Sequence, residues 1–474
     1  MNKNTPLQTG RIVSVDFFRG LAIFGVALIH SIMFGVFYTI DNTLAVIPLP
    51  LLIVLAPLVL LAPLAGLFAF ISATAKVFIS QKRLEEGHSL KSVLQPILVT
   101  SAALLILHFL YTLIFRSPGS SMFDSKILVD SFLSGTIRQW KVQPIVFESF
   151  LYMNAMAMVS VTGLITAAAL AIWNRKRTPL DRTLRLLTVI GILSVFAAPF
   201  VWALFWKPLV YCYSADGALR LLSIPLSFLS AKMHCLPGIF PFVIFGLWFG
   251  FLFASHPSYS EVIRKTRPLA VLFTILFFLS VGVRVFLTIG SQTVLWKAIE
   301  KTGLITILSW NTPGMAEGNL MGAFFDYRMV PTEFHFFGLL LAFGGFPLLL
   351  RIFDYCSEDR KKIRAARVLP IVRFGTLSLT VFFLEPTVNF LFSKPFHLLL
   401  GGELSPVMNP ITPDRFMLSP QIWFLFPILI LLFWGVTLKL WEKVNYRFSL
   451  EWFFVRLTSP FRKIKSEKLS QRIK

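Results

Sequence analysis

Four ionisable side chains lie inside long apolar stretches, where a charged or hydrogen-bonding group is costly and usually functional. They are His30, His108, Arg284 and Glu385. A histidine at such a depth is a candidate general base, and a nearby carboxylate is a candidate partner that orients its ring. Three further groups lie at the outer edges of apolar stretches: Glu148, Glu333 and His335. With the membrane topology argued below, all seven fall in the outer half of a bilayer, which predicts one polar cavity that opens outward.

The first apolar stretch also carries charge at its opposite end. Asp16 and Arg19 are three residues apart, so they can pair within one helical turn, and Gly20 permits close approach of another helix. Arg19 and His30 are about three turns apart, which places both side chains on one helix face about 16 Å from each other. A cation at the inner face and a base near the outer side suit a reaction between a cytoplasmic anionic donor and an external acceptor.

Each of these residues also has a purely structural interpretation. A lone histidine such as His30 or His108 can simply be hydrogen-bonded to a neighbouring helix. Arg284 can pair with Glu385 or Glu148 as a structural bridge, because an unpaired buried charge carries a large penalty. Glu148, Glu333 and His335 can be in contact with water.

The composition identifies the elements that must position these groups. Of 474 residues, 56% are hydrophobic and only 14% are charged, compared with about 25% charged residues in soluble domains. Apolar runs of roughly 20 residues predict an all-α, polytopic membrane bundle with about ten transmembrane helices. The predicted spans are 18–40, 50–80, 94–115, 149–173, 186–206, 236–255, 268–290, 334–353, 369–392 and 420–439. Pro48, Pro50, Pro57 and Pro63 predict an irregular outer approach to the second span.

The distribution of basic residues predicts the orientation of this bundle. The net charge is +22, and Lys and Arg gather in alternate loops, as they do in cytoplasmic loops of membrane proteins. The alternation predicts that both termini are cytoplasmic and that nucleic acid is not a partner. Residues 1–440 are expected to form the membrane domain, and residues 441–474 a basic amphipathic tail on the inner leaflet.

The cysteines predict no metal site, because there are three of them and no C-x-x-C pair. Cys212 and Cys235 fall in the same predicted outer loop, so a disulfide between them is a hypothesis.

The residues around the first span resemble a known superfamily. The pattern R-x-x-S-V-D-x-x-R-G-L-A-I, which starts at Arg11 and is followed by His30, is similar to the first helix of the transmembrane acyltransferases. These include polysaccharide O-acetyltransferases and heparan-alpha-glucosaminide N-acetyltransferase. The Arg-to-His spacing is similar to that of the O-acetyltransferases, whose corresponding histidine is held to be catalytic.

The rest of the chain resembles one branch, the YeiB-like family of bacterial membrane proteins. Four segments resemble that family in the same order: Leu107-His108, the Pro-rich run from Leu236 to Gly246, the run from Phe374 to Glu385, and the tail from Trp441 to Thr458. The family's G-D-I-L segment is absent, and Glu148-Ser-Phe-Leu stands in its place. Glu385 stands where relatives tend to have Gln or His.

The resemblance implies a multi-pass protein of the cell membrane. It would move an acyl group, most simply acetyl, from cytoplasmic acyl-CoA to an extracytoplasmic glycan or lipid. His30 would be the general base, with Glu385, Glu148 or His108 orienting it and Arg284 steadying the oxyanion. The donor's phosphates would meet the inner-face bases Arg19, Lys82, Arg83 and Arg177. Asp16, which can pair with Arg19, would belong to the same donor-binding set.

Two other functions stay open at this point. A transporter or flippase for a small anionic or lipid-linked solute would use the same polar cavity. A pair of helices broken at Pro or Gly in both halves would favour it, and the sequence offers one candidate, around spans one and two. A non-catalytic scaffold of the cell envelope is the third alternative, although it gives intramembrane charges less reason to exist.

Overall fold

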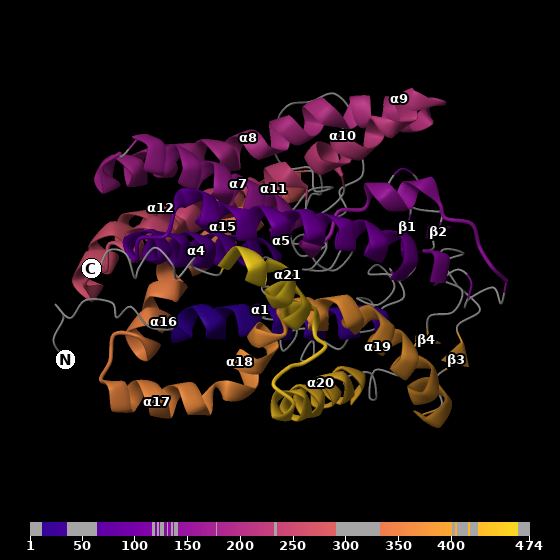
Figure 1. Ribbon diagram of the computed structural model, residues 1–474. Coiled ribbons are helices and arrows are strands. Elements are labelled where there is room, and N and C mark those ends of the chain that lie inside the picture. The colour runs from indigo at the N-terminus through magenta and orange to yellow at the C-terminus, as the bar shows by residue number, and fades with distance from the viewer. Residues whose placement is uncertain are drawn as a thin grey trace.

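A computed structural model describes most of the predicted membrane domain. The described residues are 12–35, 64–115, 119–120, 123, 128–129, 131–133, 136, 141–176, 178–231, 235–290, 332–400, 403–404, 416–417 and 425–462. These parts of the chain are almost entirely helical (Figure 1), which confirms the all-α prediction. Two antiparallel pairs of two-residue strands accompany the helices: β1 (Gly119–Ser120) with β2 (Leu128–Val129), and β3 (Glu403–Leu404) with β4 (Phe416–Met417).

The helices follow the order of the apolar stretches. The first half contains α1 (Val13–Gly35), α4 (Leu64–Glu85), α5 (Leu90–Leu110), α7 (Ala155–Lys176) and α8 (Leu180–Ser214). The short α9 (Ala218–Leu221) and α10 (Ser223–Ser230) precede α11 (Leu236–Ala254) and α12 (Tyr259–Gly290). The second half contains α15 (Thr332–Leu340), α16 (Phe346–Phe353), α17 (Glu358–Arg367), α18 (Leu369–Thr376), α19 (Ser378–Leu400), α20 (Leu425–Lys443) and α21 (Leu450–Arg462). Single-turn π-helical segments extend α5 through Tyr111–Phe115 and join α15 to α16 through Leu341–Gly345.

Several of these helices are long and apolar enough to cross a membrane. Within the described residues there are eight, and nine if α18 and α19 count as one span bent by 87°. The remaining predicted span, 50–80, overlaps α4, which is less apolar because it carries Lys76, Lys82 and Arg83. The prolines expected before it, and residues 50–63, lie outside the described part of the chain. The protein is therefore a multi-pass helical bundle with about eight candidate spans.

The centre of the bundle is α11, which lies among α4, α7 and α8 (Figure 1). Its apolar window is 89% buried, more than that of any other candidate span. Two glycines allow α4 to approach closely, because a Cβ at Gly246 would lie 2.4 Å from the carbonyl oxygen of Phe70. A Cβ at Gly250 would lie 2.5 Å from a side-chain carbon of Val77. Small residues of this kind let helices pack where lipid gives no hydrophobic driving force.

Segments predicted to share a membrane face contact one another. At one end, the side chains of Lys265 and Asp181 are 2.6 Å apart, and those of His256 and Glu85 are 3.8 Å apart. At the other end, Tyr213 donates to Glu148 at 3.4 Å. In Figure 1 α17 lies at the left end of the bundle, and both strand pairs lie at the right end. The alternation of basic and balanced loops thus corresponds to two separate ends of the fold.

The structure does not contain the hypothesised disulfide, because Cys212 and Cys235 are both free thiols and both buried. The span predicted to end at 206 continues as α8 to Ser214. Cys212 consequently lies in the last turns of a helix and not in a loop. Cys235 directly precedes α11, where it packs with Ala198 and Trp202.

The C-terminal segment packs against the bundle. After α20 the chain turns through residues 444–449 and continues as α21, which contacts α5 and α19. Ser449 and Thr458 of this segment are buried, whereas Phe453 and Val455 are exposed. One face of α21 is therefore covered by protein, and the other is exposed. That this segment lies on the inner leaflet stays a prediction.

Candidate functional site

Two of the predicted residues, His30 on α1 and Glu385 on α19, form a hydrogen-bonded pair. Nδ1 of His30 lies 2.8 Å from Oε2 of Glu385. When Glu385 is ionised, its carboxylate only accepts hydrogen bonds, so Nδ1 then carries the proton and donates it. In the neutral ring Nε2 is then the nitrogen that can take up a proton. The Glu385 side chain is 1% exposed, whereas that of His30 is 33% exposed.

Asn389 completes this pair from one turn further along α19. Its Nδ2 donates to Oε1 of Glu385, so both carboxylate oxygens are engaged. The Asn389 Oδ1 atom is buried and has no hydrogen-bond partner among the described residues. The sequence analysis missed Asn389, although the i, i+4 spacing of an acid and an amide in an apolar helix was a usable signal.

The position of the pair depends on a crossing between α1 and α18. A Cβ at Gly20 would lie 2.1 Å from the carbonyl oxygen of Ile371, and a Cβ at Gly375 would lie 2.7 Å from that of Asp16. The two backbones thus touch at a pair of glycines, as expected for Gly20. Immediately after this contact the chain bends by 87° and continues as α19, which runs alongside α1.

Distant carboxylates cap the first turns of both helices that carry the pair. Asp354 accepts from the backbone N–H groups of Val13 at 2.8 Å and Ser14 at 3.0 Å. Glu451 accepts from those of Leu379 at 2.6 Å and Thr380 at 3.2 Å. Burial raises the pKa of Asp354 and of Glu451, and the hydrogen bonds that each accepts partly oppose that effect.

The candidate donor-binding residues lie toward the opposite end of α1. Arg19 Nη2 is 3.3 Å from Asp16 Oδ1, which confirms the predicted pairing. Lys82 and Arg83 lie in the last turn of α4 and are half-buried. Arg177 lies outside the described residues.

His108 has a separate environment. Its Nδ1 is 3.0 Å from Oδ1 of Asn154, and the same oxygen accepts from the backbone N–H groups of Met156 and Ala157 at the start of α7. Oδ1 is an acceptor, so Nδ1 carries the proton. Nε2 of His108 is buried with no partner among the described residues. Through Asn154, Nδ1 of His108 thus links α5 to the start of α7.

Of the remaining predicted site residues, the structure describes the side chains of Glu148 and His335. Glu148 is 3% exposed in the 3-10 segment Phe147–Leu151 and accepts from Tyr213. Nε2 of His335 lies 2.7 Å from the carbonyl oxygen of Gly238, and its ring stacks on Phe242. The side chains of Arg284 and Glu333 lie outside the described part of the chain.

The sequence analysis also missed Lys76. It lies in the middle of α4, and its Nζ donates to the carbonyl oxygen of Val159 on α7 at 3.3 Å. A Cβ at Gly163 would lie 3.2 Å from this nitrogen. Lys76 lies inside the predicted second span, but it was not among the ionisable residues considered there.

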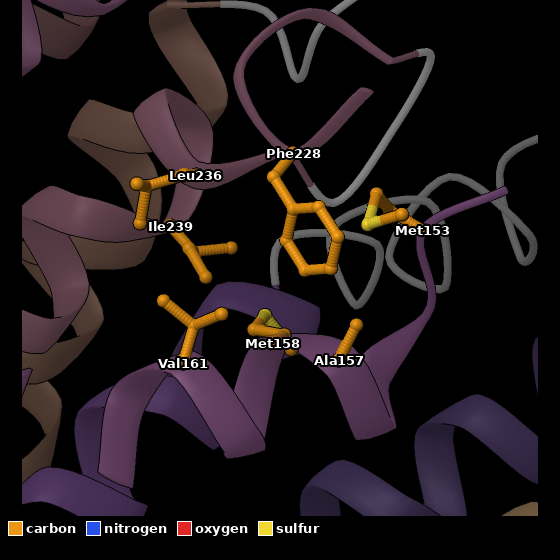
Figure 2. A pocket seen from close by; sticks show the side chains of 7 residues that line it. All are labelled: Met153, Ala157, Met158, Val161, Phe228, Leu236 and Ile239. Carbon is orange, nitrogen blue, oxygen red and sulfur yellow. The ribbon is translucent and has the colours of Figure 1, made fainter. Parts of the chain in front are cut away.

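A small pocket lies away from the His30–Glu385 pair. Figure 2 shows its seven lining side chains, among them Met153, Met158, Phe228 and Ile239, which come from α7, α10, α11 and the segment before α7. All seven are apolar. The free volume is about 10 Å³, room for about one water-sized molecule. This pocket lacks the groups that acid–base chemistry needs.

Comparisons with known proteins find no matching family model, no matching curated protein and no matching solved structure.

Proposed function

We propose that this protein is a membrane-embedded acyltransferase that moves an acyl group from cytoplasmic acyl-CoA to an extracytoplasmic glycan or lipid. The observation that carries the proposal is the hydrogen bond between His30 and Glu385 inside the bundle. A carboxylate that fixes the tautomer of a histidine is the arrangement of a general base in acyl transfer. The resemblance of the first span to the transmembrane acyltransferases supports the same assignment.

In the proposed reaction, Nε2 of His30 removes the proton from the acceptor's hydroxyl or amine as its oxygen or nitrogen attacks the thioester carbonyl. Glu385 stabilises the imidazolium that forms. The carbon–sulfur bond then breaks, and the imidazolium returns the proton to the departing CoA thiolate. The reaction thus needs no oxidant, reductant or metal.

Arg19 is proposed to meet the phosphates of the donor, together with Lys82, Arg83 and Arg177. Arginine binds phosphate through two parallel hydrogen bonds. The Arg19 side chain is 36% exposed even though it pairs with Asp16, so it is accessible from outside the bundle. The proposal places this end of the fold, with both termini, in the cytoplasm and the protein in the cell membrane.

The test is binding and turnover of acetyl-CoA by the purified protein in nanodiscs. We expect CoA to raise the thermal stability of the wild type, Arg19→Ala to weaken that effect, and His30→Ala to retain binding but lose acyl transfer. Glu358→Gln, on the exposed first turn of α17, is the matched control and should behave as the wild type. If neither acetyl-CoA nor CoA changes the stability at millimolar concentration, the proposal fails.

A transporter is the second candidate, favoured by the 87° break between α18 and α19. Discontinuous helices beside a buried ionisable pair are typical of ion-coupled transporters. Sealed proteoliposomes distinguish the two functions. An acyltransferase consumes acetyl-CoA supplied on the Arg19 side. A transporter instead moves a solute across the membrane without CoA, driven by an imposed proton gradient.

A further inference from the structure

The carboxylate of Glu451 closes the first turn of α19, the helix that carries Glu385. Its Oε1 accepts from the backbone N–H groups of Leu379 and Thr380, and its Oε2 accepts from the Thr380 hydroxyl. The Thr380 hydroxyl accepts in turn from the backbone N–H of Leu450 at 2.9 Å. Four hydrogen bonds therefore join the start of α21 to the start of α19.

This contact provides hydrogen-bond acceptors for backbone N–H groups at the start of α19, which the bend before this helix leaves without helical partners. A helix begins with four backbone N–H groups that have no partner inside the helix. The chain bends by 87° before α19, so α18 does not continue into α19 and does not fix the direction of the α19 axis. Thr380 is only 2% exposed, which leaves little access for water as a substitute. Glu451 is the carboxylate that satisfies the Leu379 and Thr380 N–H groups at this end.

The same contact lies close to the His30–Glu385 pair. Glu385 follows Thr380 by less than two helical turns, or about 8 Å along the axis. The hydrogen bond between His30 and Glu385 joins two different helices at 2.8 Å, and a shift of α19 by about 1 Å would lengthen it beyond the usual range. The register of α19 therefore sets the geometry of the pair.

We propose that Glu451 is a positioning residue, which holds α19 in the register that places the Glu385 carboxylate on Nδ1 of His30. This inference rests on the proposed function, because it assigns the C-terminal helix a part in keeping His30 in one tautomer. Arg373 and Glu442 assist on the other side of the break. Their side chains form two hydrogen bonds, of 2.9 and 2.6 Å, between α18 and α20.

Asp354 provides an internal comparison. It caps α1 as Glu451 caps α19, but His30 lies about five turns beyond the capped residues. The crossing at Gly20 also holds α1 between those two points. Removal of this cap should cost stability without moving His30 against Glu385.

The test is the NMR signal of the His30 Nδ1 proton in nanodiscs with histidine-labelled protein, assigned by its loss in His30→Gln. A ring N–H that donates to a carboxylate resonates far downfield. We expect Glu451→Gln to weaken or shift this signal, because the new amide N–H₂ leaves the Thr380 hydroxyl without an acceptor. Thr380→Val should act in the same way, whereas Thr380→Ser and Asp354→Asn should keep the wild-type signal.

In the acyl-transfer assay, Glu451→Gln and Thr380→Val should lower kcat and leave KM nearly unchanged. We expect kcat to fall about tenfold in Glu451→Gln and Thr380→Val, with KM for acetyl-CoA within twofold of the wild type. An unchanged His30 signal in both variants overturns the proposal. An equal change in Asp354→Asn overturns it too, since that result would reflect a general loss of stability. If the signal responds as expected but no form transfers acetyl groups, the proposed function fails and the positioning role stands.

Discussion

Glu385 and His30 differ in how much of each side chain is exposed. The carboxylate is almost inaccessible at 1%, and the imidazole retains 33%. The imidazole is therefore more accessible than the carboxylate behind it. Such a division suits a base that exchanges protons with a reactant while its partner stays constant.

Glu385→Gln tests whether the buried carboxylate supports His30 as a base, because it replaces one carboxylate oxygen by an amide nitrogen. Glutamine retains the shape but removes the charge that stabilises the imidazolium, and its amide can reverse the tautomer of His30. We expect kcat for acyl transfer to fall about 10²- to 10⁴-fold, with KM nearly unchanged. Steady-state kinetics in nanodiscs measures both constants. A kcat within threefold of the wild type would show that Glu385 is only a structural partner.

Sequence alone could select His30 and Glu385 as candidates, because ionisable groups are rare within apolar runs. It could not choose Glu385 over Glu148 or His108 as the partner of His30, since that choice depends on which helices are neighbours. Asn389 was missed because a neutral amide does not stand out in a search for charges. Lys76 was missed because the candidates within the spans were sought among His, Arg and Glu, and a lysine inside the predicted second span was not considered.

At the level of helices, the crossing of α1 and α18 determines where α19 can start. Two glycines make this crossing, and each has backbone of the other helix where its Cβ would be. Any side chain at Gly20 must push α18 away from α1, and it would move α19 as well.

Gly20→Ala should therefore destabilise the protein although alanine favours helix. Overpacking against a backbone carbonyl costs about 1–3 kcal/mol. Gly282→Ala on α12 is the matched control, because nothing described lies within 4 Å of its Cβ position. It should be neutral or slightly stabilising in a thermal unfolding series in detergent. Equal unfolding temperatures for the two variants would contradict the role of the crossing.

Helix positions followed largely from apolar length, yet helix ends did not. α8 continues to Ser214 because nothing in the local sequence stops it at 206: Pro208 is tolerated inside the helix. The bend before α19 was likewise not foreseen, because it depends on contact with α1 and on a cap from α21. Both are tertiary contacts, which a local pattern does not contain.

Taken as a whole, the molecule has two chemically different ends. Basic loops meet at one end, and the aromatic cluster around Tyr213, Phe147 and Arg220 lies at the other, where the Arg220 guanidinium is 4.6 Å from the Phe147 ring centroid. From the positive-inside rule we expect the basic end to face the cytoplasm.

Cysteine labelling tests that orientation. Lys141 and Lys362 are both exposed and lie at opposite ends of the fold. In a Cys356→Ser background, where the buried Cys212 and Cys235 remain, an impermeant thiol reagent outside intact cells should modify Lys141→Cys but not Lys362→Cys. Permeabilised cells should show modification of both. The opposite pattern would invert the protein and place the donor site outside.

The caps on α1 and α19 also bear on how the chain is made. Asp354 accepts from the backbone N–H groups of Val13 and Ser14, so α1 stays without this cap until the residues after α16 have been synthesised. α19 likewise stays without its cap until Glu451 of α21 has been synthesised. Both helices must therefore insert into the membrane with uncapped N-termini, and their capped arrangement forms only after α21 has been synthesised. We expect a chain truncated before α21 to insert into the membrane, but its α19 would lack the cap from Glu451.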